Sequence, residues 1–214
     1  MINIQKSEEI PACLAETKDH KCCIELIQKE FLHKCYLCEN NNLTSIQTDH
    51  FDPDKNLRLD WKNLFYSCGH CNGIKSNKNI GILNPIDFSI IITDAIKFEI
   101  ITIPKEKPVF TALIDAVSAK LTVDLLTEIH QPNTVNRRLE ASNLNKVICE
   151  EVIAFTMKIL KFYSANSIEK KSKIKNDLKD MLDLSSRFLA YKIWIIKSND
   201  ERLKDFGDLL PIFK

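Results

Sequence analysis

Hydrophobic residues recur every three or four positions along several stretches of the chain, a spacing that places them on one face of a helix. The longest stretch runs from Val135 to Phe162, roughly eight helical turns. Residues 8–34 show the same spacing over a shorter length. Ser167 begins a more polar helix that reaches residue 184, and the last apolar helix covers residues 188–195. We therefore expect helices over most of the chain.

Shorter stretches in the first half have the composition of strands. Residues 43–50 are rich in Thr and Ile and end shortly before Pro53, and residues 61–66 form a second extended segment. A short helix is expected at residues 72–78. This order of two strands and a helix predicts a small α+β unit.

A hairpin is expected at the start of the second half. Residues 89–93 and 98–103 have strand composition and are joined by Asp94-Ala95, which we interpret as the turn. The predicted fold class is α+β. We expect a core in residues 1–85 and a hairpin followed by helices in residues 86–214.

The composition favours a mainly helical globular protein. Of 214 residues, 44% are hydrophobic and 28% charged, and 4 are glycine, which disfavours a compact all-β fold. The formal net charge is +1, so the chain lacks the basic excess of many nucleic-acid-binding proteins. Positive charge is local instead. Between positions 54 and 78, Asp54 and Asp60 are outnumbered by Lys55, Arg58, Lys62, Lys75 and Lys78.

Neither a secretory signal nor a membrane span is expected. The N-terminal sequence lacks an apolar signal segment, and the most apolar stretch, residues 86–103, contains Asp87, Asp94, Lys97 and Glu99. A spanning helix needs about 20 mostly apolar residues. We therefore expect a cytoplasmic protein with no membrane partner. In a reducing compartment, eight cysteines favour metal binding over disulfides.

Two Cys-x-x-Cys pairs give the strongest chemical signal. They are Cys35/Cys38 and Cys68/Cys71, with 29 residues between them (39 to 67). Each pair turns two thiolates to one side, and two pairs complete a tetrahedral shell for Zn²⁺. Four sulfur ligands leave no open position for water, so we expect a structural zinc. His70 is a minor alternative ligand. The other cysteines, Cys13, Cys22, Cys23 and Cys149, are expected to pack as small apolar residues.

Polar residues between and beside the two cysteine pairs suggest hydrolytic chemistry. Asp49 and His50 end the first predicted strand, Asn63 follows His50 by 13 residues, Asn72 follows Asn63 by 9, and Lys75 lies one turn farther. Phosphodiester hydrolysis needs a base, a cation and a group that holds the phosphate. His50, a cation held by Asp49 and Asn72, and Lys75 would provide these three.

Each of these residues also has a simpler interpretation. Asp49 and His50 could form an ordinary hydrogen bond at a strand end, Asn72 could cap a helix, and Lys75 and Lys78 could belong to a solvated face. The remaining histidines outside the cysteine pairs are expected to be solvated; they are His20, His33 and His130.

The run TDHFDP…DWKNLFYSCGHCNGIKSNK resembles the HNH branch of the His-Me finger (ββα-metal) nucleases, in its form with a Cys₄ zinc. The resemblance implies that His50 is the general base and that Asp49 and Asn72 bind one divalent cation, expected to be Mg²⁺. It implies that Asn63 braces the loop between the strands and that Lys75 contacts phosphate. Since adjacent residues of a regular strand face opposite sides, the resemblance also implies that the strand becomes irregular at Asp49.

Dispersed segments resemble a narrower family, the small HNH proteins called PtuB. They are KSEEIPACLAE, CYLCE, DHFDP, WKNLFYSC, ILNPID and SSRFLAYKIWII. Many PtuB-like sequences have Glu where this chain has Asp49. PtuB proteins are the nuclease half of Septu-type anti-phage systems and of some retron defence systems, beside an ABC/SMC-like ATPase, PtuA. The resemblance implies such a partner, docked on the C-terminal helices, of which residues 188–196 are the most apolar.

The sequence thus predicts a metal-dependent HNH endonuclease that acts on DNA or RNA. The alternative is a zinc-containing nucleic-acid-binding or adaptor subunit of an ATPase complex whose catalytic residues have lapsed. Nothing in the sequence distinguishes DNA from RNA as the substrate.

Overall fold

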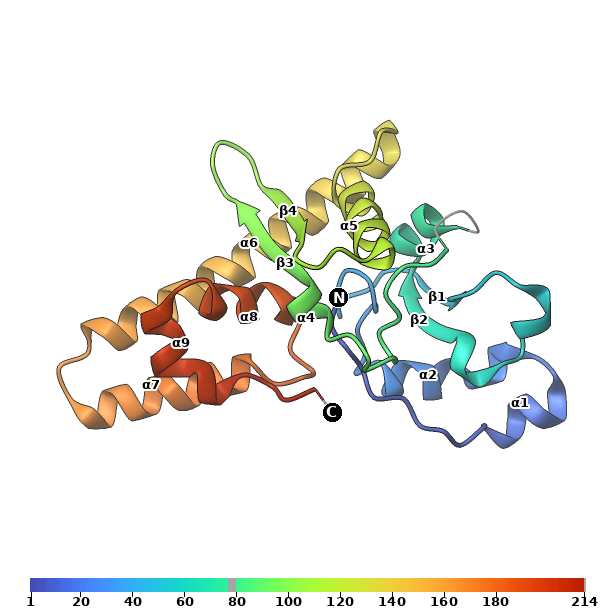
Figure 1. Ribbon diagram of the computed structural model, residues 1–214, viewed down its shortest axis with the longest axis horizontal. Coiled ribbons are helices and arrows are strands. Elements are labelled where there is room, and N and C mark those ends of the chain that lie inside the picture. The colour runs from blue at the N-terminus through green and yellow to red at the C-terminus, as the bar shows by residue number, and fades with distance from the viewer. Residues whose placement is uncertain (77–79, 214) are drawn as a thin grey trace.

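The computed structural model describes residues 1–76 and 80–213, and within these residues the chain is an α+β protein with two separate two-stranded antiparallel sheets. One sheet and the first three α-helices lie at one end of the molecule, and helices α7 to α9 lie at the other (Figure 1). The second sheet and α5 lie between them. No helix in the described part of the chain is long and apolar enough to cross a membrane.

The first helical region is divided into three pieces. They are α1 (Ala12–Thr17), the 3₁₀ helix η1 (His20–Cys23) and α2 (Ile24–Glu30). The continuous helix expected over residues 8–34 is interrupted at Lys18, which has a left-handed φ of 52°. Asp19 then caps the next turn, because its side chain accepts a hydrogen bond from the Lys21 backbone.

The two expected strands and the helix after them are present with shifted ends. Strand β1 (Ile46–His50) pairs with β2 (Leu64–Cys68), and α3 (Gly69–Lys75) follows directly. The register runs without interruption to its last two pairs, Asp49↔Phe65 and His50↔Leu64. The expectation that β1 becomes irregular at Asp49 is therefore wrong. Short 3₁₀ helices, η2 (Lys55–Leu57) and η3 (Trp61–Asn63), lie in the connection between the strands.

The hairpin lies farther along the chain than the sequence suggested. Asp94 and Ala95 belong to a short helix, α4 (Ile92–Ala95), and not to a turn. Strand β3 (Ile96–Ile101) pairs instead with β4 (Lys107–Ala112). The error arose because a short apolar run such as residues 89–93 has no periodicity that separates a strand from a helical turn.

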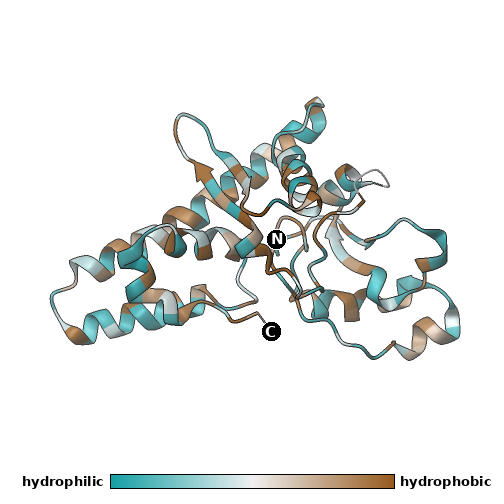
Figure 2. Ribbon diagram, in the orientation of Figure 1, coloured by the Kyte–Doolittle hydropathy of each residue, from teal (hydrophilic) through white to brown (hydrophobic). Residues whose placement is uncertain are grey.

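The long helical patterns are largely confirmed. Helix α5 (Val117–His130) leads to α6 (Val135–Ser164), whose buried residues keep the three-to-four spacing from Ala141 to Ile159, although Val135 and Leu139 at its start are exposed. Hydrophobic bands recur along this helix (Figure 2). Ser167 caps α7 (Ile168–Met181) by accepting a hydrogen bond from Lys170.

The most apolar helix is used inside the chain. Helix α8 (Leu189–Lys197) is followed by α9 (Asp200–Phe206) and a final 3₁₀ turn, η4 (Gly207–Leu209). Phe188, Leu189 and Ile196 are fully buried, as is Lys192, which pairs with Glu151 of α6 at 2.7 Å. Burial within the chain accounts for the composition of α8, so an apolar surface left for a partner is not needed to explain it.

A buried carboxylate joins the first and second halves. Glu39 is 2% exposed and accepts from the Met1 ammonium at 2.6 Å and from the backbone of Leu189 and Ala190 at the start of α8. Lys34 lies 4.0 Å from the same carboxylate. Buried hydrophobic residues of both halves belong to one continuous core.

We expect Glu39→Gln to lower the free energy of unfolding by about 3–5 kcal/mol, since removing one partner leaves buried cations uncompensated. Burial alone would raise the pKa of Glu39, but the Met1 ammonium and Lys34 outweigh it and hold the pKa below its ordinary value of 4.5. The stabilisation is therefore present above pH 4.5 and disappears as the pH falls through the lower folded pKa.

Denaturant unfolding of both proteins at several pH values measures this difference. Glu8→Gln is the control, because Glu8 pairs with Lys62 on the surface and is 86% exposed, so its loss should change little. An equal effect of the two substitutions at neutral pH would show that Glu39 does not stabilise the fold in this way.

Candidate functional site

The four cysteines of the two Cys-x-x-Cys pairs converge at one point in the structure. The sulfur atoms of Cys35, Cys38, Cys68 and Cys71 all lie within 4.8 Å of one another, and all but Cys68 are buried. A tetrahedral zinc with Zn–S bonds of 2.3 Å needs sulfur atoms about 3.8 Å apart. Two of the sulfur atoms come from a tight turn, in which Glu39 N donates to Cys35 O at 2.8 Å. Cys68 ends β2 and precedes α3, and Cys71 lies in the first turn of α3. The cluster could hold a zinc ion.

The electrostatics of the cluster favour a bound cation. Burial raises the pKa of Cys71 well above that of a free thiol. Burial would also raise the pKa of Cys35, but hydrogen bonds from the other three cysteines outweigh it and lower that pKa. Four thiolates this close together repel one another unless a cation neutralises them, so a thiophilic divalent ion fits this donor set.

His70 is not part of the cluster. Its Nδ1 lies 2.8 Å from Glu140 Oε2 of α6, and its Nε2 lies 2.9 Å from the backbone oxygen of Ile129 in α5. Both ring nitrogens are therefore engaged with other elements. His70 connects α3 to the helical half of the molecule and does not compete with the cysteines.

Helix α3 lies along β1, and two side-chain pairs join them. Asn72 donates to the side chain of Gln47, and one turn later Lys75 reaches Asp49. Residues 47 and 49 share one face of the strand, and residues 72 and 75 share one face of the helix. Asn72 lies in the middle of α3, so the interpretation of this residue as a helix cap is wrong.

Asp49 is held by a buried ion pair. Lys75 Nζ lies 3.3 Å from Oδ1 and 3.2 Å from Oδ2, and Tyr36 Oη donates to Oδ2 at 2.6 Å. Asp49 is 5% exposed and Lys75 only 1%, and Lys75 also donates to the backbone oxygen of His50 at 3.0 Å. Burial raises the pKa of Asp49, against the opposing effects of Lys75 and Tyr36.

This arrangement does not fit the divalent cation expected at Asp49 and Asn72. Of these two residues only Asp49 has a carboxylate, and the Lys75 ammonium already contacts both of its oxygens. The Asn72 amide donates a hydrogen bond to Gln47. Mg²⁺ needs oxygen ligands arranged octahedrally with room for water. Lys75 is buried at 1% exposed, so in this arrangement it does not present the solvent-facing ammonium expected of a phosphate contact.

His50 has a defined orientation at the end of β1. Its Nε2 lies 3.1 Å from the backbone oxygen of Arg58. A carbonyl can only accept, so Nε2 carries the hydrogen of the neutral ring and Nδ1 is left with a lone pair. The ring is half-exposed. Nδ1 has no hydrogen-bond partner among the described residues, so its lone pair can accept a hydrogen bond.

Asn63 braces the loop that orients His50. Its amide nitrogen donates to the backbone oxygens of Asp52 and Leu57 at 2.9 and 3.1 Å, and its oxygen accepts from Asp52 N at 2.7 Å. Leu57 directly precedes Arg58, whose carbonyl contacts His50. Asn63 is 5% exposed, so its hydrogen bonds hold the loop from inside.

The N-terminal region contributes a residue that sequence reasoning did not place at the site. His20 packs edge-on against His50, with ring centroids 5.0 Å apart, so its expected role as a merely solvated residue is wrong. Burial, followed by the neighbouring His50, lowers the pKa of His20. The sequence has no local signal for this contact because 30 residues separate the two histidines.

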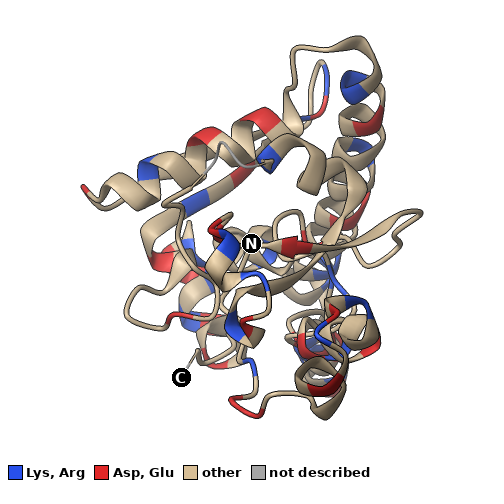
Figure 3. Cartoon of the chain, turned by 90° about the vertical axis from the view of Figure 1, so that its right-hand side faces the viewer, with Lys and Arg blue, Asp and Glu red and all other residues tan. Residues whose placement is uncertain are grey.

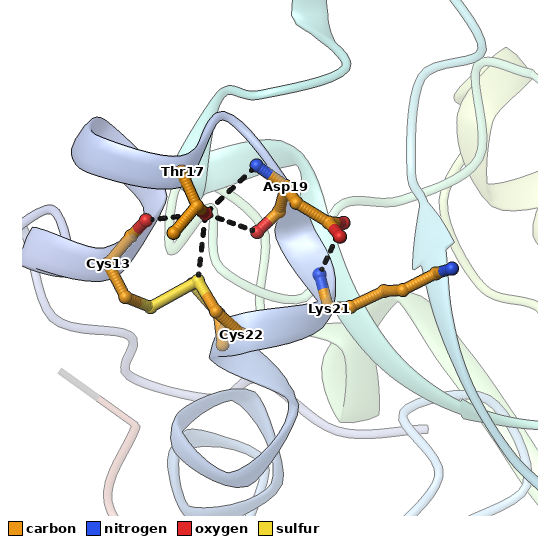
Figure 4. Close-up of a disulfide and its surroundings, with 6 residues drawn as sticks. Cys13, Thr17, Asp19, Lys21 and Cys22 are labelled. Atoms are coloured by element: carbon orange, nitrogen blue, oxygen red, sulfur yellow. Dashed lines mark hydrogen bonds between the residues drawn. A yellow bond between two sulfur atoms is a disulfide. The ribbon is translucent and has the colours of Figure 1, made fainter.

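A disulfide lies on the same segment. Cys13 and Cys22 form a disulfide, and Thr17 Oγ1 donates to the Cys13 backbone oxygen across the enclosed turn (Figure 4). The free thiol of Cys23 lies within 3.5 Å of Cys22 Sγ. The expectation that these cysteines pack separately as apolar residues is wrong for Cys13 and Cys22. Cys23 and Cys149 are buried and free, as expected.

The local excess of positive charge is smaller in space than in sequence. Lys75 is buried against Asp49, and Lys62 pairs with Glu8 at 2.8 Å. Lys78 lies outside the described residues. Lys55 and Arg58 remain near the loop. Seen from this end of the molecule, basic and acidic residues are interspersed (Figure 3).

Comparison of the chain with protein-family models, curated proteins and solved structures finds no significant match.

We expect the purified chain to contain about one zinc per molecule, and Cys68→Ser to lose it and melt at a lower temperature. Structural zinc contributes roughly 10–16 kcal/mol of apparent binding energy in zinc-finger peptides. Elemental analysis and thermal unfolding test both expectations. Cys149→Ser is the matched control, because it removes a buried free thiol outside the cluster. Zinc-free wild-type protein would contradict the assignment.

We expect Lys75→Met to destabilise the protein by about 3–5 kcal/mol, because Asp49 is left buried without a cation. The double substitution Asp49→Asn with Lys75→Met removes both charges and should recover most of the loss. A double-mutant cycle by chemical denaturation measures the coupling. Additive effects of the two substitutions would show that the ion pair does not stabilise the contact between β1 and α3.

Proposed function

We propose that this chain is an HNH endonuclease that hydrolyses phosphodiester bonds in nucleic acid and is stabilised by a Cys₄ zinc. The single observation that carries the proposal is the orientation of His50 by the Arg58 carbonyl, within a loop that Asn63 braces. Strand β1, strand β2 and α3 around a four-cysteine cluster support it, since they are the element order expected for a ββα-metal core.

In the proposed reaction, His50 Nδ1 removes a proton from the attacking water. The Nε2 hydrogen bond to Arg58 keeps the ring from turning and stabilises the positive charge that forms on it. Asn63 does not touch the reacting atoms. It is a positioning residue that acts through the backbone from Leu57 to Arg58.

The catalytic cation would supply stabilisation of negative charge on the phosphate. Because Lys75 already neutralises Asp49, the binding site proposed from the sequence is not assembled in this arrangement. We therefore assign no step to that cation.

The Asp49–Lys75 ion pair also favours a second candidate function, a zinc-containing nucleic-acid-binding or adaptor subunit that has lost catalysis. Cleavage assays of the purified chain in Mg²⁺, in Mn²⁺ and in chelator separate the two candidates. Cleavage in any of these conditions that depends on His50 supports the nuclease.

The PtuB resemblance further suggests that the chain is the nuclease subunit of a bacterial anti-phage complex with an ABC/SMC-like ATPase. The exposed residues Ile153, Met157 and Leu160 follow one another on one side of α6 and could contact such a partner. Mass spectrometry of what co-purifies with the chain from its native host tests this. Recovery of the chain alone would remove the support for a stable complex.

We expect His50→Asn to reduce cleavage by about 10²–10⁴-fold, which is the usual contribution of a positioned base. The variant should keep its zinc and its melting temperature, because His50 is half-exposed and its only hydrogen bond in the described chain is to Arg58 O. The rate should be measured on single-stranded and duplex DNA and on RNA.

His33→Asn is the matched control, since His33 is exposed and its positive φ of 59° is tolerated by asparagine. It should cleave like the wild type. A His50→Asn protein that cleaves at the wild-type rate would show that the base lies elsewhere and that the HNH assignment is wrong.

A further inference from the structure

A cavity of about 660 Å³ lies away from His50, where the connection between β3 and β4 meets the junction between α5 and α6. Its volume is within the range of small-molecule sites. Apolar walls come from Ile101, Pro104, Pro132 and Ala141. None of these residues has a role in the proposed nuclease.

Three cations surround this cavity. Lys105 and Lys107 come from the hairpin connection, and Arg138 comes from the first turn of α6. All three side chains are exposed, and none forms an ion pair with another described residue. One acidic residue, Glu106, also lines the cavity. The cations outnumber it, so the opening attracts anions.

The cavity is closed on one side by a buried hydrogen-bonded pair. His130 is 3% exposed, and its Nδ1 lies 2.7 Å from Asn145 Oδ1. The Asn145 amide nitrogen donates to the His130 backbone oxygen at 3.0 Å, which fixes the amide so that its oxygen faces the ring. Nδ1 therefore carries the hydrogen, and Nε2 is an acceptor. Burial lowers the pKa of His130 to about 4, so the ring is neutral near pH 7.

His130 Nε2 is available to a ligand. It has no hydrogen-bond partner among the described residues. It is not fully buried either, because the fully buried side-chain atom without a partner among those residues is Tyr191 Oη. Some of its surface is therefore open, and His130 lines this cavity. The sequence expectation of a solvated His130 was wrong, because the residue is enclosed by α5, α6 and Phe110.

We propose that this cavity binds a nucleoside phosphate. Cations at the opening suit the phosphate, apolar walls suit the flat faces of a base, and the His130 acceptor suits a ring or exocyclic N–H. A free nucleotide and the terminal nucleotide of a nucleic-acid strand share this chemistry. The site does not depend on the nuclease assignment.

The site is connected to α3, the helix that carries Cys71 of the four-cysteine cluster. The first turns of α6 line the cavity with Arg138 and Asn145 and also hold α3, because Arg137 donates to the backbone oxygen of Gly73 at 2.8 Å. The backbone oxygen of Ile129, the residue before His130, accepts a hydrogen bond from His70 of α3. A ligand in the cavity would therefore contact the first turns of α6, which also hold α3 in place.

Isothermal titration of the zinc-loaded full chain with AMP, adenosine and inorganic phosphate tests the proposal. AMP should bind more tightly than either part alone. Arg138→Gln should weaken AMP binding roughly tenfold or more, because it removes a charge-assisted contact. Lys161→Gln, which removes an exposed cation from the far part of the same helix, should leave binding unchanged. Ser142→Trp, at the edge of the cavity, should block binding without changing charge.

The proposal is overturned if AMP shows no saturable binding, if phosphate binds as tightly as AMP, or if Arg138→Gln and Lys161→Gln behave alike. Competition identifies the source of the ligand. A 5′-phosphorylated oligonucleotide that displaces AMP, when its unphosphorylated form does not, identifies a strand end. AMP binding that neither oligonucleotide displaces identifies a free nucleotide.

Discussion

The convergence of four cysteine sulfurs is the constraint on which the other contacts depend. The residue after Cys38 is Glu39, which holds the Met1 ammonium and the start of α8. The residue after Cys71 is Asn72, which faces Gln47. The cluster thus positions one residue that organises the helical half and another at the candidate site. Glu39 and Asn72 are each one peptide bond from a cysteine of the cluster. An ion bound there would therefore help to fix both residues at once.

The candidate site combines a buried ion pair with a half-exposed histidine. Asp49 and Lys75 are sealed between β1 and α3, where burial makes each charge dependent on the other. His50 continues the same strand but has different partners, His20 and the Arg58 carbonyl. Because adjacent strand residues face opposite sides, the Asp49–Lys75 ion pair and the His50 ring lie on opposite sides of the strand. That separation is unlike the shared metal site that the sequence suggested.

Much of the fold could be predicted from local patterns, and the errors have a common cause. The cysteine pairs, β1, β2, α6 and α7 each carry their signal within a few residues. The hairpin was misplaced because residues 89–93 have no decisive period, and α9 was missed because it is short and polar. Asn63 was assigned to the loop through the family resemblance, and its partners Asp52 and Leu57 do lie in that loop. The partners of Lys75, His20 and His130 come from distant elements, and a neutralised or buried polar group has no local signature.

Helix α6 connects the two ends of the molecule through contacts along its length. Its 30 residues extend over roughly 45 Å. Near one end, Arg137 and Glu140 form hydrogen bonds with α3. Near the middle, Glu151 forms ion pairs with Arg187 and Lys192. Farther along, Lys158 pairs with Asp177 of α7. A straight rod pivoting at its middle by about 5° displaces each end by roughly 2 Å. That displacement exceeds the tolerance of a hydrogen bond. A displacement of α6 at its α7 end would therefore act directly on its contacts with α3.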